Sequence, residues 1–210
     1  MRIQPSLILC LSVFAVTADA AKNAEVKPLL TSPASVTMQD EFDRDSLGKN
    51  WFVGKGEWSI VDGSLVGKEL AADKHAAVAM LKHPNTDSAV KLSFKLDGAE
   101  GFSFSLNHKK GHLFRVVVMK DRLIVRTDRD KKDPKSKVET LDSAKADFAQ
   151  GQWHTLLIEM KGDAVAVSAD NGATIQGTHD SLATEKTGYR LVLKGESLIV
   201  DDVHVWDIAN

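Results

Sequence analysis

The 210-residue chain has only one cysteine, Cys10, and it lies within the first 20 residues. Lipid attachment through this thiol favours a small residue directly before the cysteine, whereas Leu9 is large. If the first 20 residues are removed, the remaining protein has no thiol. This excludes disulfides, cysteine nucleophiles and thiolate metal sites.

The chain also lacks an excess of one charge, a membrane-length apolar run and paired histidines. Its net charge is -2, which supplies no long-range attraction to phosphate backbones or anionic lipid and argues against a nucleic-acid partner. The seven histidines are dispersed without a His-x-x-x-His pair, so a catalytic transition-metal site has little support.

The first 20 residues have the order typical of a secretory signal peptide. Arg2 precedes the apolar stretch Leu7–Val16, and Ala18-Asp19-Ala20 supplies a small-x-small site. Because the apolar stretch is much shorter than the roughly 20 residues of a spanning helix, we expect cleavage near Ala20 and no membrane span in the mature chain. The expected destination is the periplasm or the extracellular space.

The mature chain is predicted to have a flexible lead over residues 21–38 and one domain over residues 39–210, in which short alternating segments dominate. In Val90–Leu96, apolar residues at every second position put four side chains on one face. Residues 129–137 read as a charged loop, and Leu141–Phe148 could hold one helical turn. About ten strands separated by glycine-rich turns predict an all-β sandwich of two antiparallel sheets. The other predicted strands are the opening hairpin around Trp58–Leu65, Phe102–Leu106, Leu113–Met119, Leu123–Thr127, Trp153–Met160, Ala164–Ala169, Tyr189–Lys194 and Ser197–Trp206.

Several motifs resemble a known superfamily. Gly151–Leu156 followed by Asp170–Gly172 resembles the Gly-x-Trp-His strand and hairpin of concanavalin A-like and laminin G-like jelly-roll sandwiches. Asp40–Phe42, the Gly56–Leu65 hairpin and the closing Gly195–Trp206 segment resemble one branch, the secreted bacterial 3-keto-disaccharide hydrolase domain, often labelled a family 16 glycoside hydrolase. The resemblance implies a secreted, carbohydrate-active protein that hydrolyses or eliminates (3-keto-)glycosides.

The chain departs from this family in its catalytic motifs. Family 16 glycosidases use a Glu-x-Asp-x-x-Glu strand with carboxylates as nucleophile and acid/base. The nearest segment here, Glu41–Ser46, ends in Ser46, whose hydroxyl cannot replace a carboxylic acid. The Asn-Ser-Gly and Glu-x-Gln-x-x-Asp segments common in keto-disaccharide hydrolases are also absent, so the chain resembles a short, divergent relative.

Two polar clusters could carry chemistry. His112 and Arg115 flank a strand start, and Lys74 and His75 follow the opening hairpin. Histidine exchanges protons near neutral pH, whereas arginine and lysine grip oxygen-rich ligands. His75 and His112 are therefore candidate catalytic residues, and Lys74 and Arg115 candidate substrate-binding residues. A strand-end histidine, a sheet-surface arginine and a solvated loop explain the same residues without chemistry.

Aromatic and acidic residues suggest two further features. Trp51 is expected in a loop as an exposed platform on which a sugar ring stacks, whereas Trp153 and Trp206 are expected in the core. Asp40 and the Asp201–Asp202 pair lie on terminal strands and could hold a structural calcium ion. They could equally cap turns at the sheet edge.

Three functions remain open at this point. The first is a carbohydrate-active hydrolase or lyase, and the second is a non-catalytic module that binds glycans or proteins. The third is a structural envelope protein. A concave site that joins His112, Arg115 and either Lys74 or His75 would favour an enzyme.

Overall fold

The computed structural model describes residues 22, 24–32, 35–109, 111–130 and 133–208. The predicted signal peptide and Cys10 lie outside this range and stay predictions. Within it, no helix has the length and apolarity needed to cross a membrane. The strands are β1 (Val36–Asp40), β2 (Trp51–Lys55), β3 (Glu57–Val61), β4 (Ser64–Lys68), β5 (Ala77–Asn85), β6 (Ser88–Leu96), β7 (Ala99–His108), β8 (Gly111–Met119), β9 (Arg122–Thr127), β10 (Thr140–Lys145), β11 (Trp153–Lys161), β12 (Ala164–Ala169), β13 (Thr174–Thr178), β14 (Lys186–Gly195) and β15 (Leu198–Asp207), with 3-10 turns η2 (Ala71–Asp73) and η3 (Asp180–Ala183).

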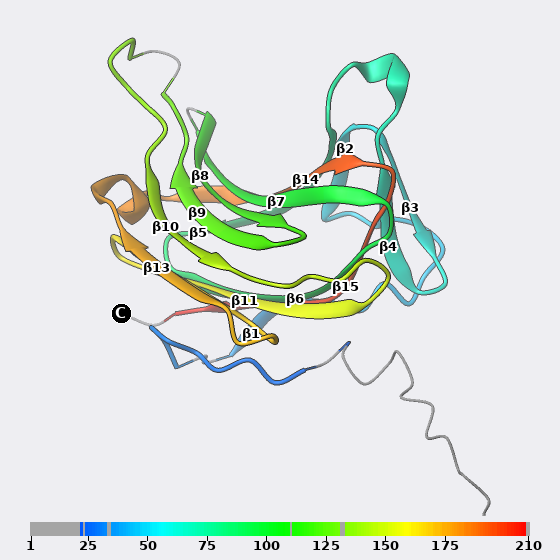
Figure 1. Ribbon diagram of the computed structural model, residues 1–210, viewed down its shortest axis with the longest axis horizontal. Coiled ribbons are helices and arrows are strands. Elements are labelled where there is room, and N and C mark those ends of the chain that lie inside the picture. Colours follow the sequence, from blue (N-terminus) through cyan, green and yellow to red (C-terminus); the bar gives the residue numbers. More distant parts are fainter. Residues whose placement is uncertain (1–21, 23, 33–34, 110, 131–132, 209–210) are drawn as a thin grey trace, which may run out of the picture.

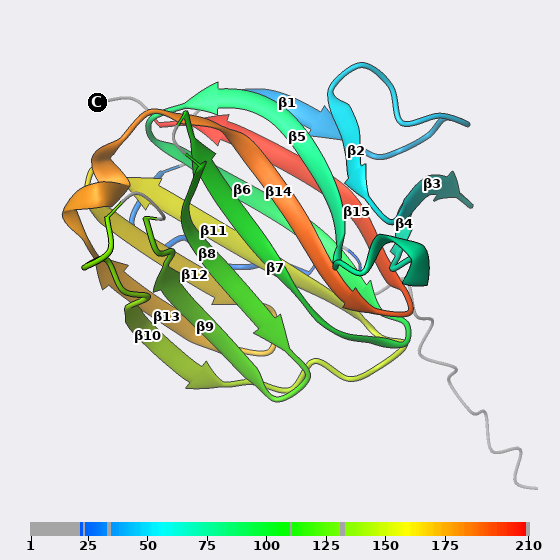
Figure 2. The same cartoon turned by 90° about the horizontal axis from the view of Figure 1, so that it is seen from above.

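The strands form two antiparallel sheets that pack face to face (Figures 1 and 2). Sheet A has the order β13-β12-β11-β6-β15-β4-β3, with β1 also paired to β15. Sheet B has the order β10-β9-β8-β7-β14-β5-β2. This architecture confirms the predicted all-β jelly-roll sandwich. Figure 1 shows that sheet B curves so that its outer side is concave.

The core fills the space between the sheets with side chains from alternate strand positions. Phe94 of β6 contacts Phe102 of β7 with ring centroids 4.9 Å apart, and Phe148 also packs on Phe94. All three are at most 2% exposed. Because side chains alternate between the two faces of a strand, the residues between these positions face outward. Once one core residue of a strand is known, the residues on its outer face follow from this alternation.

Strand β15 changes partners at an irregularity. Its Leu198–Val200 segment pairs with β4, whereas Val203–Trp206 pairs with β1. Between them the register against β6 shifts, and Asp202 adopts a left-handed backbone with φ of 52°. An inserted residue of this kind lets one long strand serve two neighbours. The pairing of β1 with β15 confirms that Asp40 and Asp201–Asp202 lie on paired terminal strands.

The structure corrects one predicted element and adds others. Leu141–Phe148 holds no helical turn, because Thr140–Lys145 is strand β10 and pairs with β9. The sandwich also contains Ala77–Asn85 and Thr174–Thr178 as strands that the periodicity did not indicate. The first strand begins at Val36, inside the segment expected to be a flexible lead.

The segment before β1 crosses the outer face of sheet A, where Figure 1 draws it in blue. Glu159 of β11 is fully buried and accepts hydrogen bonds from the backbone N–H groups of Leu29, Leu30 and Thr31. Lys22 forms an ion pair with Asp201 over 2.7 Å. This N-terminal strap (residues 22 and 24–32) therefore covers sheet A and leaves the outer face of sheet B uncovered.

Candidate functional site

The outer face of sheet B carries a row of residues from six neighbouring strands. Arg190 illustrates the pattern, since Tyr189 and Leu191 on either side of it are buried in the core. Three arginines belong to the row, and with neighbouring strands about 4.8 Å apart they span roughly 14 Å. The ladder registers align the row in the order Phe52, Met80, Arg190, Ser105, Arg115 and Arg126.

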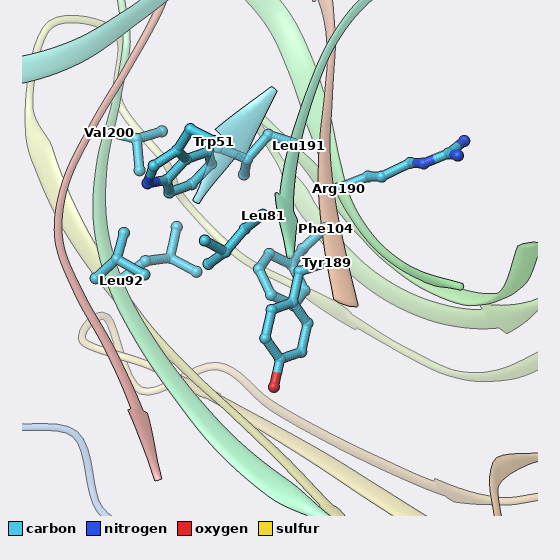
Figure 3. Close-up of a pocket in the computed structure, with 9 residues that line it drawn as sticks. Trp51, Leu81, Leu92, Phe104, Tyr189, Arg190, Leu191 and Val200 are labelled. Atoms are coloured by element: carbon cyan, nitrogen blue, oxygen red, sulfur yellow. The ribbon is translucent and has the colours of Figure 1, made fainter. Parts of the chain in front are cut away.

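Figure 3 shows Arg190 extending away from the sandwich interior while Tyr189 points into it. The gap that these residues line between the sheets has a volume of only about 10 Å³. A space of this size hardly holds one water molecule. The interior is therefore not a ligand cavity, and the outer face of sheet B is the surface to consider.

Two open hollows lie along the arginine row. The first has a volume of about 250 Å³ and is lined by Phe52, Met80, Lys82, Asn107 and Arg190 among others. The second has a volume of about 550 Å³. A third, more apolar hollow of about 300 Å³ lies further along the strands. The residues lining the second hollow are His112, Arg115, Arg126, Asp128, Arg129 and Val138.

The second hollow unites two predicted site residues, His112 and Arg115. The Nδ1 atom of His112 lies 3.4 Å from the Oγ atom of Ser105. The guanidinium of Arg115 donates from Nε to both oxygens of Asp128, and its Nη2 atom lies 2.6 Å from Oδ1. The bidentate pair fixes Arg115 in the hollow and neutralises its charge.

The second predicted pair, Lys74 and His75, lies elsewhere. Both are exposed in the loop between η2 and β5, where the His75 ring contacts the carbonyl of Ala76 over 2.7 Å. Strand β5 begins at Ala77. The strand registers align Ala77, across the strands of sheet B, with Val118 of β8. Val118 lies six residues from His112, which corresponds to roughly 20 Å along a strand. The structure therefore does not bring His75 and His112 together.

Trp51 is not the exposed platform that the sequence suggested. It lies in β2 rather than in a loop, is only 6% exposed, and donates a hydrogen bond from Nε1 to Asp40 over 2.8 Å. The next residue, Phe52, faces outward from the same strand and is 47% exposed. The exposed aromatic of this strand is therefore Phe52, and it belongs to the arginine row.

Two of the other tryptophans, Trp153 and Trp206, differ from expectation. Trp58 is buried in the core, but Trp153 and Trp206 lie outside the core cluster. Trp153 faces the outer side of sheet A beneath Lys22 and Lys95, whose ammonium groups lie 5.4 and 5.2 Å from its ring centroid. Because the strap covers it, Trp153 offers no open stacking platform.

The aspartates considered for calcium are engaged by protein donors. Asp40 accepts hydrogen bonds from the guanidinium of Arg44, the indole of Trp51 and the amide of Phe42. Although burial opposes ionisation, these donors hold the pKa of Asp40 below its usual value. A calcium ion would have to displace the Arg44 cation, so Asp40 does not fit such a site.

Asp201 is similarly occupied, since it accepts from Ser64 Oγ and pairs with Lys22. Among the described residues, the group with ligand atoms all within 4.8 Å of one another consists of Glu41, Asp202 and His204. A mixed imidazole and carboxylate set suits a divalent transition metal better than calcium, which prefers an all-oxygen shell. The three predicted aspartates thus do not form one ligand set.

The hollows of sheet B contain two carboxylates, Asp128 and Glu100, and each is paired. Glu100 binds Lys194 over 2.5 Å, and Asp128 binds Arg115. Glu100 lies next to Gly101, which pairs with Met119 of β8, and Asp128 lies next to Thr127, which pairs with Phe114 of β8. Met119 and Phe114 are five residues apart, so the two carboxylates are separated by roughly 17 Å along the strands. Glycosidase carboxylates work at about 5–9.5 Å. This pair cannot cleave a glycoside by that mechanism.

No protein-family model matches the sequence, and no curated protein matches it by sequence. The fold is similar to that of several solved proteins. The carbohydrate-binding module CBM66 from Bacillus subtilis shares 12% identity and a TM-score of 0.62, over 77% of this chain and 98% of the module. SCLam, a non-specific endo-β-1,3(4)-glucanase from family GH16, shares 12% identity and a TM-score of 0.66, over 90% and 97% of the two chains.

Porphyranase B from Zobellia galactanivorans shares 14% identity and a TM-score of 0.63, over 90% of this chain and 100% of the porphyranase. At these identities the likeness concerns the fold. It confirms the jelly-roll sandwich fold expected from the sequence. The narrower resemblance to 3-keto-disaccharide hydrolases stays a prediction.

Proposed function

We propose that this protein is an exported carbohydrate-binding protein that holds glycans on the concave outer face of sheet B. The observation that carries the proposal is the arginine row, which runs between open hollows and joins an exposed aromatic ring to polar side chains. Sugars are bound by this combination, because their ring faces stack on aromatics while their oxygens accept hydrogen bonds from cations.

Three further observations support it. The similar solved structures include a carbohydrate-binding module and enzymes named for glycan substrates. The two hollow-lining carboxylates are too far apart to act as a glycosidase pair. Among the described residues, the N-terminal strap crosses the outer face of sheet A and leaves that of sheet B open.

The test applies the protein, residues 21–210, to a glycan array and measures which glycans are retained. The same measurement is then made on a variant with a bulky side chain on the outer face of sheet B. Ser103 faces outward at the centre of sheet B, so Ser103→Tyr should abolish retention of any glycan bound there. Thr174→Tyr, at an exposed position of β13 in sheet A, is the matched control and should bind normally. Failure of the folded protein to retain any glycan would contradict the proposal.

A second candidate function is the hydrolase or lyase of (3-keto-)glycosides, and one observation favours it. His112 lies in the same hollow as Arg115, and its cross-strand partner Asn107 has a buried Oδ1 atom that finds no hydrogen-bond partner among the described residues. A histidine base suits removal of a proton next to a keto or carboxylate group, and Arg126 and Arg129 in the same hollow supply cations that stabilise the resulting negative charge.

Incubation with 3-keto disaccharides, ordinary disaccharides and uronate oligosaccharides tests this chemistry. Product release that is lost in His112→Ala but kept in His75→Ala would establish it, since the two histidines lie at opposite ends of the sheet. Absence of product with all substrates, in a sample that still retains glycans, would leave binding as the function.

A further inference from the structure

Two of the three arginines in the row have a guanidinium nitrogen with which no described residue pairs. The Nε atoms of Arg126 and Arg190 are buried and have no hydrogen-bond partner within the described part of the chain. Arg115, which lies between them, differs because its Nε and Nη2 atoms both pair with the carboxylate of Asp128. A buried donor without a partner costs free energy. Because both side chains also line open hollows, their guanidinium groups are placed to receive an acceptor from outside the chain.

The charge around each unpaired arginine is positive. The first hollow is lined by Arg190 and Lys82 without any carboxylate. The second contains Arg126 and Arg129 in addition to the Arg115–Asp128 pair. Since the whole chain carries a net charge of -2, this surplus is local to the row and does not reflect a basic protein.

From this arrangement we propose that the outer face of sheet B is selective for anionic glycans, with carboxylate or sulfate groups of the glycan binding Arg190 and Arg126. A guanidinium presents two parallel N–H donors that match two oxygens of either group. A neutral glycan offers only hydroxyl oxygens and leaves the positive charges of both hollows uncompensated. The inference rests on the proposed carbohydrate function and names its ligand class.

The spacing of the row indicates how such a glycan lies. Arg190 and Arg126 are three strands apart, or roughly 14 Å, which is too far for one anionic group to reach both. They therefore bind groups on different sugar units of the same chain. At the other end of the row, Phe52 and Met80 offer an apolar surface beside Arg190 for the face of a sugar ring. An oligosaccharide should bind much more tightly than its monosaccharide.

The experiment measures dissociation constants by calorimetry for two pairs of oligosaccharides. Oligogalacturonate and its methyl ester form the carboxylate pair, and a sulfated galactan fragment and its desulfated form provide the sulfate pair. Tighter binding of one charged member by at least about tenfold is expected, equivalent to one charge-assisted hydrogen bond. The pair that shows the difference identifies the anionic group, and the difference should shrink at high salt.

Single substitutions then locate the effect. Arg126→Gln and Arg190→Gln should each weaken binding of the charged oligosaccharide about tenfold, and by a larger factor than they weaken binding of the neutral form. Lys161→Gln removes a cation from the exposed end of β11 in sheet A and should change neither. Arg126→Lys and Arg190→Lys keep the charge but lose the forked geometry, so intermediate affinities are expected. Melting curves verify that all variants are folded.

The outcomes separate this inference from the proposed function. Equal affinities for the charged and neutral members of both pairs would overturn anionic selectivity. So would a charge preference that survives both glutamine variants. If neutral glycans bind and Ser103→Tyr abolishes their binding, the carbohydrate function stands without the inference. If no oligosaccharide binds at all, both fail.

Discussion

The N-terminal strap should depend on the carboxylate of Glu159. This side chain is fully buried, and every group that contacts it in the strap is a donor. Its Oε2 atom accepts the amide of Leu29 at 2.6 Å, and Oε1 accepts the amides of Leu30 and Thr31 and the hydroxyl of Thr31. In Glu159→Gln one carboxylate oxygen is replaced by an NH₂ group, which cannot accept a hydrogen bond. The Leu29 N–H then meets another donor and loses its acceptor.

The expected loss is about 3 kcal/mol in the free energy that holds the strap closed. Losing the charge-assisted bond to Leu29 costs about 1.5 kcal/mol or more, and the three remaining bonds weaken by about 0.5 kcal/mol each when the acceptor becomes neutral. Since about 1.4 kcal/mol is a factor of ten, opening of the strap should become roughly 100-fold more frequent. The sandwich itself should stay folded, because the strap lies outside its core.

Amide hydrogen exchange measured by NMR tests this reasoning. The amides of Leu30 and Thr31 should exchange roughly 100-fold faster in Glu159→Gln, whereas that of Val167 in the core strand β12 should not change. Glu185→Gln, which alters an exposed carboxylate, is the matched control. Exchange at Leu30 and Thr31 no faster than in this control would refute the assignment of Glu159 as the strap's anchor.

Three other substitutions test the packing and the buried charges. Burial opposes ionisation of Asp40, but hydrogen bonds from Arg44 hold its pKa below the usual value. Ionised Asp40 therefore stabilises the fold above about pH 4, and this contribution is lost as pH falls through the lowered pKa. In Asp40→Asn the free energy of unfolding should depend less on pH in this acidic range, and an unchanged slope would contradict this. Lys186 is fully buried and donates to three carbonyls, so Lys186→Met should cost about 1–3 kcal/mol in denaturant titrations. Burial also lowers the pKa of Lys186, so wild-type stability should rise with pH between that lowered pKa and its ordinary value, and a rise of the same size in the variant would argue against this cause. A Cβ atom at Gly67 would lie 2.5 Å from the ring of Trp58, so Gly67→Ala should destabilise by about 1–3 kcal/mol, and an unaltered melting temperature would show that the ring moves freely.

The sandwich was predictable because most of its strands carry their burial pattern within a few residues. Val90–Leu96 alternates cleanly, and the structure confirms it as part of β6. Thr140–Lys145 was missed because it is an edge strand with only one large apolar residue, Leu141, and its identity depends on pairing with β9. A pattern confined to one segment cannot report a partner 14 or more residues away.

The candidate site was predictable only in part, for the same reason. Arg115 and His112 were recognised from one segment, and they do share a hollow. Arg126 and Arg190 were missed, because their alignment with Arg115 depends on the register of strands far apart in sequence. The available signal was a cation at an outward-facing position of each predicted strand. Trp51 was expected in a loop, but it lies in β2 with its ring buried, so the exposed aromatic of this segment is Phe52.

The most direct test of the account is an NMR titration of the mature protein with the oligosaccharide that binds most tightly, observing the arginine Nε–H signals. If the outer face of sheet B holds the glycan, the signals of Arg126 and Arg190 should shift together and saturate at the calorimetric affinity. Glu159 and the strap amides should remain unperturbed. Saturable shifts confined to sheet A, with the two arginine signals unmoved, would contradict the account.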